Sequence, residues 1–490
     1  MKKGEIYEGI VKELKFPNKG IVESEGEKCT VKNTIPGQRI SFRVTKSRHG
    51  DSEGNLLEVL DKAPNEAVIP NCPHFGKCGG CAFQSLSYED QLSLKEKEVL
   101  DLLKDIEIGK YEGALASPDI FGYKNKMEFS FGDEEKGGEL TLGLHKRGSF
   151  YDVVPVPGCR IVCEDIRKIL IAVLEECRRQ KLSYYHKMKH EGLLRHLMVR
   201  RSDSTGEILL GLVTTTQENI DLTAICDKVL SLDLSGRISG FLHIINDLPA
   251  DTVQAERIDV LYGKDHFYEE LLGLRFKVTP FSFFQTNSKG AEVLYSTARS
   301  FILPSVSGRD PVVFDLYSGT GTIAQMLSPV AKKVIGVEIV PEAVESAKEN
   351  ARLNNIENCE FICDDVLKAL DTIEERPDFI VLDPPREGIH PKALPKLLEY
   401  GVQNMLYISC KPTSLARDLP AFIAAGYKVE RLAMVDMFPW TANIETVVQL
   451  SKGDIDRDSS VRKSIAKTDD IGMISGYNKG NKAPETTNIK

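Results

Sequence analysis

Hydrophobic and polar residues alternate in short runs over the first 60 positions, as in YEGIVKELKF, QRISFRVTKS and NLLEVL. Alternation with a period of two is typical of β-strands that are buried on one face. Gly9, Gly20 and Gly37 separate the runs at the spacing of turns between short strands. Residues 1–60 are therefore predicted to form a small β-barrel, an architecture that often binds oligonucleotides.

The middle of the chain has a mixed pattern. Residues 85–104 repeat apolar positions with a period near 3.6, which predicts a helix. Further along, strand-like runs such as MEFSFG, LTLGLH, HLMVRRS and GEILLGLVTT are interspersed with helical stretches. We assign residues 61–280 to an α+β middle domain.

From about residue 310, predicted strands and helices alternate regularly. VVFDL, KVIGVEIV, DFIVLDPP and NMLYISC predict strands, and PEAVESAKENARLNN and TSLARDLPAFIAAG predict helices. Such alternation is typical of a doubly wound, mostly parallel sheet. Residues 281–450 are predicted to form a Rossmann-like α/β domain, and the polar residues 451–490 a disordered tail or extension.

Composition limits the location and the partners of the chain. Its 490 residues contain no apolar run long enough for a membrane span and no export signal at the N-terminus, so a cytoplasmic protein without a membrane partner is expected. The net charge of -9 argues against a polyanionic partner on average. However, residues 1–50 and 178–201 carry local net charges of +5 and +7. Such patches suit phosphate contact, or they are solvated charged faces.

The segment VFDLYSGTGT predicts a strand that ends in a glycine turn before a helix. Gly319 and Gly321 allow close approach of a ligand, and Glu338 lies 23 residues after Asp315, where an acid suits ribose hydroxyls. The turn fits the dinucleotide fingerprint G-x-G-x-x-A, so NAD remains an alternative cofactor. The last two predicted strands have no helix between them, which favours a single nucleoside-sized site and S-adenosylmethionine.

Two further strand ends carry reactive side chains. Asp383 follows a predicted strand in LDPPREG, and Cys410 follows the next one in NMLYISC, so both face the same crevice. Cys410 is a candidate nucleophile, and the start of the next helix and Lys411 are expected to lower its pKa. The alternative is a buried structural cysteine.

Methylation at C5 of a pyrimidine requires such a thiol, because C5 is too weak a nucleophile unaided. Thiolate addition at C6 activates C5, and a general base must later remove the C5 proton. Glu445, at the start of a late predicted strand, is the candidate base. The alternative is an ordinary exposed strand glutamate.

Cysteines are clustered in CPHFGKCGGC, which places Cys72, Cys78 and Cys81 in a C-x5-C-x2-C pattern. Cys159 or Cys163 offers a fourth thiol. The chain has 11 cysteines and no export signal, so disulfides are not expected. Four thiolates suit zinc or a [4Fe–4S] cluster, and the three-plus-one arrangement favours iron–sulfur.

The motifs CPHFGKCGGC, FFQTN, DLYSGTGT, LDPPR, YISCKPTSLARDL and MFPWTANIETV occur in an order that resembles the RNA uridine-5-methyltransferases. Within that family the chain is most similar to the iron–sulfur branch that acts on 23S rRNA and carries an N-terminal TRAM domain. The resemblance covers about residues 1–450. It implies S-adenosylmethionine as cofactor, a [4Fe–4S] cluster and an RNA substrate; we expect a monomer.

The resemblance also implies residue roles. Cys410 matches the nucleophile and Glu445 the general base. The cofactor-binding positions are matched by Gln285, Tyr317, Glu338 and Asp383, and less securely by Asp365. The cluster ligands are matched by Cys72, Cys78, Cys81 and Cys159. Lys411 and Asn443 depart from the family, which usually has Asn and His at these positions.

Two other functions remain open from the sequence. One is a tRNA T-loop uridine methyltransferase, although that branch usually lacks the cysteine cluster and the TRAM domain. The other is a non-catalytic RNA-binding protein with an inactive methyltransferase domain. The presence of both Cys410 and Glu445 argues against an inactive site.

Overall fold

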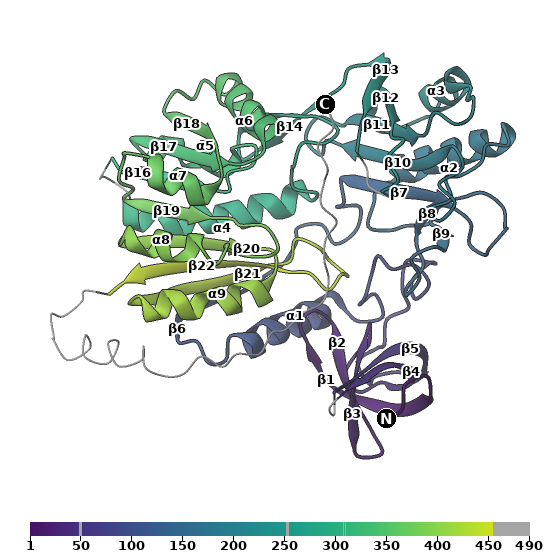
Figure 1. Cartoon of the computed structure of the whole chain (residues 1–490), viewed down its shortest axis with the longest axis horizontal. Coiled ribbons are helices and arrows are strands. Elements are labelled where there is room, and N and C mark those ends of the chain that lie inside the picture. The colour runs from purple at the N-terminus through teal and green to yellow at the C-terminus, as the bar shows by residue number, and fades with distance from the viewer. Residues whose placement is uncertain (49–50, 251–253, 307, 309, 454–490) are drawn as a thin grey trace, which may run out of the picture. The chain divides into compact units, whose positions relative to one another are not determined.

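The computed structural model describes residues 1–48, 51–250, 254–306, 308 and 310–453. The alternating N-terminal segment forms a closed barrel with the strand order β1-β2-β3-β5-β4 (Figure 1). Its strands are β1 (Ile6–Lys15), β2 (Lys19–Ser24), β3 (Glu27–Lys32), β4 (Arg39–Arg48) and β5 (Asp51–Asp61). Residues such as Val22, Val31 and Phe42 alternate inward and fill the barrel.

Helix α1 (Tyr88–Leu102) occupies the range predicted to be helical. The hydroxyl of Ser87 caps its first turn by accepting the N–H of Asp90 at 3.0 Å. The carboxylate of Glu98 accepts the N–H of Asn18 at 2.9 Å, so the helix is bonded to the barrel. Burial raises the pKa of Glu98 to about 7.

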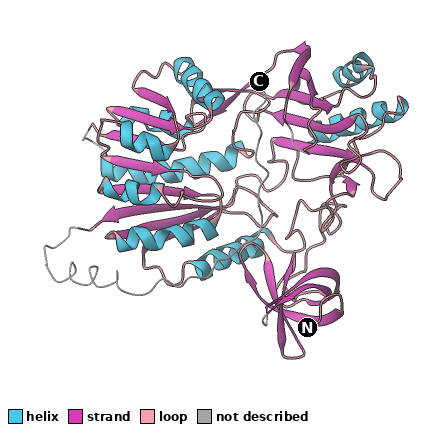
Figure 2. Cartoon of the chain, viewed as in Figure 1, coloured by secondary structure: helices cyan, strands magenta, loops and turns pink. Residues whose placement is uncertain are grey.

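The middle of the chain forms a seven-stranded sheet with the order β13-β12-β11-β10-β7-β8-β9. The four strand-like runs found in the sequence correspond to β7, β8, β10 and β11. The strands are β7 (Lys126–Gly132), β8 (Thr141–His145), β9 (Val153–Pro155), β10 (Leu194–Arg201), β11 (Glu207–Thr214), β12 (Arg237–Ile245) and β13 (Arg257–Gly263). Helices α2 (Glu164–Arg179) and α3 (Leu222–Leu230) accompany them, and a hairpin of β14 (Phe267–Leu271) and β15 (Leu274–Val278) follows (Figure 2).

The C-terminal sheet has eight strands in the order β18-β17-β16-β19-β20-β22-β21-β6. The strands are β6 (Ile108–Leu115), β16 (Val312–Leu316), β17 (Lys333–Glu338), β18 (Cys359–Cys363), β19 (Phe379–Leu382), β20 (Asn404–Ser409), β21 (Tyr427–Val435) and β22 (Glu445–Lys452). β16 to β20 pair in parallel, whereas β22 is antiparallel to both of its neighbours. The predicted doubly wound sheet is confirmed.

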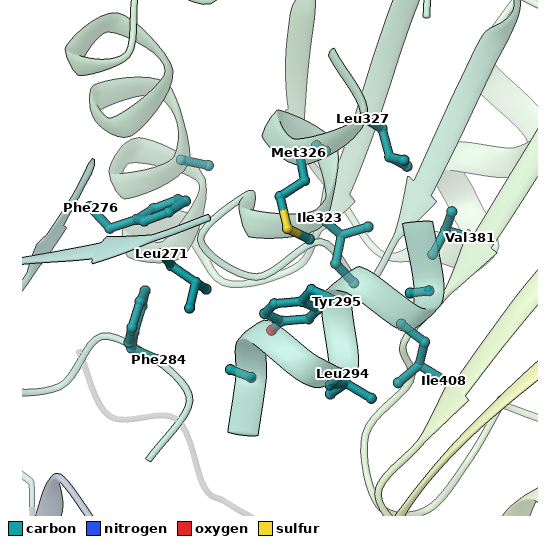
Figure 3. Packing of buried hydrophobic residues seen from close by; sticks show 14 of the residues in the cluster. Leu271, Phe276, Phe284, Leu294, Tyr295, Ile323, Met326, Leu327, Val381 and Ile408 are labelled. Carbon is teal, nitrogen blue, oxygen red and sulfur yellow. The ribbon is translucent and has the colours of Figure 1, made fainter. Parts of the chain in front are cut away.

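Helices cover both faces of this sheet, as a parallel sheet requires. Val313, Val381 and Ile408 pack toward α4 to α6, where Figure 3 shows Val381 and Ile408 among the clustered side chains. The neighbouring residues Phe314 and Leu382 belong to a second cluster, toward α1 and α7 to α9. The helices are α4 (Ser288–Val306), α5 (Thr322–Leu327), α6 (Pro341–Leu353), α7 (Val366–Thr372), α8 (Ala393–Glu399) and α9 (Pro412–Ala424), with a 3₁₀ turn at Ser328–Val330.

The structure divides the chain differently from the ranges 61–280 and 281–450. β6 lies in the range assigned to the middle domain, but it pairs with β21 at the edge of the C-terminal sheet. This pairing covers an edge that would otherwise expose a row of unpaired backbone groups. β22 continues to Lys452, and the rest of the predicted tail, from residue 454, lies outside the described residues. None of the described helices is long and apolar enough to cross a membrane.

Candidate active site

Cys410 and Glu445 lie at the same edge of the C-terminal sheet. β20 ends at Ser409, so Cys410 is the first residue beyond that strand. β22 runs in the opposite direction and begins with Glu445. The ladder pairs Ser409 with Thr446, which places Cys410 beside Glu445 at the carboxyl end of β20. Asp383 follows β19, the other neighbour of β20, at the same edge.

These three groups affect one another electrostatically. Glu445 is 4% exposed, and burial followed by the charge of Asp383 raises its pKa to about 8. Burial raises the pKa of Asp383 to about 7. Burial, Glu445 and Asp383 together raise the pKa of the Cys410 thiol to about 11. Three side chains that become negatively charged on deprotonation are therefore close together at this edge of the sheet.

The expected lowering of the Cys410 pKa is wrong, because its pKa is raised. Helix α9 does begin directly after Lys411. However, Lys411 is exposed, whereas Cys410 is half-buried and the charges of Glu445 and Asp383 raise its pKa. Loss of hydration and like charge disfavour the thiolate more strongly than the helix terminus favours it.

Arg386 is the residue at this edge that the sequence reasoning missed. Its positive charge lowers the pKa of both Cys410 and Glu445, opposing the effect of Asp383. It belongs to the LDPPREG motif, so a charged residue directly after two strand-end prolines was the signal that could have identified it.

The glycine turn after β16 is shaped by close contacts. A Cβ atom at Gly321, where φ is +76°, would lie 2.7 Å from the ring of Phe361, so only glycine fits. A Cβ atom at Gly319 would meet nothing within 4 Å, which shows open space beside the turn. The N–H of Gly319 donates to the Glu338 carboxylate at 3.0 Å, so β17 and the turn are bonded at the predicted ribose position.

Asp315, which served in the sequence analysis only to count the distance to Glu338, lies at the site itself. It is fully buried, and one carboxylate oxygen accepts the N–H of Ala324 at 2.9 Å. Its other oxygen and the Ser318 hydroxyl are buried without a hydrogen-bond partner. Burial and the charge of Asp383 raise the pKa of Asp315 to about 8. Unpaired buried polar atoms beside an open turn indicate a place for a polar ligand.

Gln285 lies at a small pocket against the glycine turn. The pocket is lined by Phe283, Gln285, Tyr295 and Thr320 among others. The Gln285 amide donates to the Tyr295 hydroxyl at 3.3 Å, and Figure 3 shows Tyr295 below Ile323 of α5, to the right of Leu271 and Phe284. Gln285 is therefore brought to the glycine turn from a segment that precedes α4.

Tyr317 follows β16 and Asp365 lies just beyond β18, with β17 between these two strands. Tyr317 begins the turn with a positive φ of +68°, and burial followed by the charge of Asp365 raises its pKa to about 12. Asp365 also caps α7, because its carboxylate accepts the N–H of Leu367 at 2.8 Å. This capping alone explains an acid at position 365, so a ligand role has less structural support than at Glu338.

The four cysteines singled out in the sequence lie together. The pKa of Cys81 is raised to about 12 by burial and by the charges of Cys159, Cys78 and Cys72, in spite of a hydrogen bond from Gln84. The pKa of Cys159 is raised to about 11 by burial and by Cys72 and Cys78. All eleven cysteines are free thiols.

Cys163 has a different environment. It precedes α2, and the charged groups that affect its raised pKa are Arg201 and Asp165. Charges of the other clustered thiols thus affect the pKa of Cys159 and not that of Cys163, which favours Cys159 as the fourth thiol. Within the described ranges, no group of three or more His, Cys, Asp or Glu side chains is placed so that it could hold a metal ion.

The basic segment 178–201 exposes fewer positive charges to a partner than its sequence suggests. Arg195 and Arg200 are 2% exposed. Arg195 donates to the carbonyls of Asn246 and Leu248 at 2.8 and 2.6 Å, and Arg200 donates to those of Thr279, Pro280 and Ser282 at 2.8, 3.2 and 2.7 Å. Tyr185 is also buried. These two arginines stabilise loops, so the surface charge of this segment is lower than its sequence indicates.

The whole fold is similar to the tRNA (uracil-54, C5)-methyltransferase of Pyrococcus abyssi in complex with S-adenosyl-L-homocysteine. The TM-score is 0.70 at 25% sequence identity, over 90% of this chain and 100% of that one. Together with the strand-end site, this likeness defines a class I methyltransferase that depends on S-adenosylmethionine.

Sequence comparisons specify the family. A model described as tRNA (Uracil-5-)-methyltransferase matches residues 272–453. An uncharacterized RNA methyltransferase of Clostridium tetani is 46% identical over 456 residues, which cover 93% of this chain and 99% of the relative. Another, from Clostridium acetobutylicum, is 47% identical over 454 residues, with 92% and 99% covered. The chain belongs to the RNA uracil-5-methyltransferase family, and its substrate is RNA.

Proposed function

We propose that the protein methylates C5 of uridine in 23S rRNA, with Cys410 as nucleophile and Glu445 as general base. The observation that carries this proposal is the β20–β22 register, which brings a thiol and a buried carboxyl group to one edge of the sheet. Neither residue is near the other in sequence. A thiol beside a carboxyl group with a pKa of about 8 is the pair that this chemistry requires.

The Cys410 sulfur adds to C6 of the uracil ring, and the C5–C6 double bond becomes an enolate that is nucleophilic at C5. Bound S-adenosylmethionine supplies the methyl group that C5 takes up. The Glu445 carboxylate then removes the C5 proton, and the electron pair of that C–H bond restores the double bond as the Cys410 sulfur leaves. Arg386 favours the thiolate, because its charge lowers the pKa of Cys410.

The residues around the glycine turn fit S-adenosylmethionine. The open space at Gly319 and the unpaired atoms of Asp315 and Ser318 provide room and polar groups. A sulfonium cation also relieves the repulsion among Asp315, Asp383 and Glu445, whose pKa values are all raised. Of the matched positions, Gln285, Tyr317, Glu338 and Asp383 are the proposed cofactor-binding residues, with Asp365 as a further candidate.

We also propose that Cys72, Cys78, Cys81 and Cys159, the positions that match the cluster ligands of the family, would hold a [4Fe–4S] cluster. Each of Cys78, Cys81 and Cys159 has its pKa raised by the charge of at least one other member. Mutually repelling thiolates are stabilised by iron, and N–H groups of Gly80 and Gln84 point at two of the sulfurs. A bound cluster would cross-link two distant segments of the chain.

The target in 23S rRNA is supported by the N-terminal barrel, which we propose to be a TRAM domain, together with the cysteine cluster. A tRNA T-loop uridine is the second candidate, because both the matched family model and the similar Pyrococcus abyssi enzyme are named for tRNA. We expect a cytoplasmic monomer in either case. Mapping 5-methyluridine in 23S rRNA and tRNA from a deletion strain tests the proposal: loss from tRNA alone would contradict the 23S assignment.

A further inference from the structure

The loop between β8 and β9, two strands labelled in Figure 1, carries two neighbouring aromatic side chains that are exposed. Phe150 is 63% exposed and Tyr151 is 57% exposed. Met188, from the segment before β10, is 68% exposed and lies next to them, with its sulfur 3.6 Å from the Tyr151 hydroxyl. Apolar side chains that gather on a surface usually mark an interaction site.

The two rings are held in a defined arrangement. They meet edge to face, with centroids 5.5 Å apart and an interplanar angle of 90°. The imidazole of His145 is parallel to the Phe150 ring, and the Lys187 ammonium lies 4.5 Å from the centroid of that ring. The Ser149 hydroxyl accepts the N–H of Tyr151 at 3.3 Å, which shapes the loop. A surface that is ordered before binding loses less entropy on binding.

The loop that carries the rings is built on the cysteine segment. The N–H of Gly79 donates to the carbonyl of His145 at 3.1 Å, and the N–H of Arg147 donates to the carbonyl of Lys77 at 2.7 Å. The Arg147 guanidinium also donates to the carbonyl of Cys81 at 2.5 Å. The clustered thiols and the exposed rings are therefore parts of one local structure.

The charges around the rings are mainly positive. Lys146 and Lys189 are exposed, and Lys187 is half-buried, whereas Asp152 is the one carboxylate within the loop 145–152. Aromatic rings with cations beside them suit nucleic acid strands whose bases are unpaired, because rings stack on bases and cations contact phosphates. In a duplex the phosphates can still contact the cations, but the base faces are stacked on one another and cannot stack on the rings.

We propose that Phe150, Tyr151, Lys187 and Met188 form an aromatic platform that stacks unpaired bases of the RNA substrate. This inference rests on the proposed function, in that RNA is the substrate, and extends it by assigning a binding surface away from the sheet edge that holds Cys410. The platform favours targets in loops or single-stranded regions over continuous helices. It also gives the cysteine segment a role, which is to support the surface that holds RNA.

The test compares the full-length protein with a Phe150→Ala/Tyr151→Ala double variant. Binding to a single-stranded RNA and to a hairpin-free duplex of the same sequence is measured by fluorescence anisotropy at several salt concentrations. Tyr262→Ala is the matched control, since Tyr262 is 44% exposed on β13, at the opposite edge of the seven-stranded sheet. Phe150→Trp, which keeps an aromatic ring, is the rescue variant.

We expect the double variant to bind single-stranded RNA about 10- to 100-fold more weakly and duplex RNA unchanged. Lys189→Gln should instead flatten the salt dependence for both RNAs. Phe150→Trp, Tyr262→Ala and the affinity for S-adenosyl-L-homocysteine should stay at wild-type values. Wild-type affinity of the double variant, or equal losses on both RNAs, would overturn the platform. Absence of RNA binding by the wild type would instead contradict the RNA substrate itself, and the platform with it.

Discussion

The cysteine cluster and the sheet edge at Cys410 both contain thiols that are hard to ionise, but for different reasons. The pKa of Cys81 is raised to about 12 and that of Cys410 to about 11, with burial as the largest cause in both. At Cys81 the additional charges come from other thiols, whereas at Cys410 they come from the carboxylates of Glu445 and Asp383. Thiols that repel one another are stabilised together by metal. A thiol beside a carboxyl group combines a nucleophile with a group that can take up a proton.

The two regions are connected through backbone hydrogen bonds. The N–H groups of Ala82 and Phe83, next to Cys81, donate to the carbonyl of Trp440 at 2.7 and 3.1 Å. Trp440 lies in the loop that leads into Glu445, and a buried ion pair between Lys95 of α1 and Asp436 (2.8 Å) fixes the start of that loop. The position of the proposed base therefore depends partly on the cysteine segment.

The largest difference between the two regions should appear when single thiols are removed. Cys410→Ala should lower methyl transfer by about 10⁴-fold or more, because Cys410 is the described thiol that lies beside Glu445. S-adenosyl-L-homocysteine binding should persist. Cys363→Ala, an exposed thiol on β18 of the same sheet, is the control and should keep wild-type activity. A 5-fluorouridine RNA should form a covalent adduct with the wild type and none with Cys410→Ala. Near-normal turnover of Cys410→Ala would exclude the thiol mechanism.

Removing the carboxylate should separate attack from release. With Glu445→Gln, addition and methylation can proceed, but no carboxylate remains to take the C5 proton. Turnover should fall by about 10²- to 10⁴-fold, and a protein–RNA adduct that survives denaturation should accumulate. Gel analysis of the denatured mixture measures this adduct. Rapid release of methylated RNA by Glu445→Gln would assign the base to another group.

The cysteine cluster should respond as a unit. Anaerobically purified protein is expected to contain about four irons and four sulfides. Alanine at Cys72, Cys78, Cys81 or Cys159 should each remove the iron and lower the unfolding midpoint by about 5 °C or more. Cys163→Ala should keep both, because Cys163 lies next to Arg201 and Asp165 instead. Stoichiometric zinc without iron would replace the cluster with a zinc site.

The sequence predicted those features that depend on local pattern. The barrel, helix α1 and the alternating sheet follow from periodicity, and the strand ends of that sheet locate Asp383, Cys410 and Glu338. Their arrangement depends on topology: because β22 is antiparallel, a residue at its start lies beside one that follows β20. Spacing alone could not distinguish Glu445 from an exposed strand glutamate.

The features that the sequence missed depend on contacts between distant segments. Burial, followed by the charges of Glu445 and Asp383, raises the pKa of Cys410, so the local argument from Lys411 and the helix gave the wrong direction. Similarly, Arg195 and Arg200 bind loop carbonyls that follow far along the chain, and a count of charges in 178–201 cannot reveal this. β6 joins the C-terminal sheet from the predicted middle domain for the same reason: its partner, β21, lies more than 300 residues later.

The smallest predicted effect is on cofactor binding, and it follows from the carboxyl groups that distinguish the sheet edge from the cysteine cluster. Burial raises the pKa values to about 7 for Asp383 and about 8 for Asp315 and Glu445, all above the usual range. These groups are largely protonated at pH 6, and a cation bound beside them favours the ionised forms. Binding of S-adenosylmethionine therefore releases protons, and its affinity should rise as the pH increases from 6 to 8 and level off above 8.

Calorimetric titrations should show S-adenosylmethionine binding about tenfold more tightly at pH 8 than at pH 6. S-adenosyl-L-homocysteine lacks the sulfonium charge and should show a weaker dependence. Asp383→Asn should flatten the curve, whereas Glu360→Gln should leave it unchanged, because Glu360 is exposed on the edge strand β18 and pairs with Lys333. If both ligands follow the same pH profile, the carboxyl groups at this edge do not sense the sulfonium. The carboxyl groups that distinguish the environment of Cys410 from that of the clustered cysteines would then not affect cofactor binding.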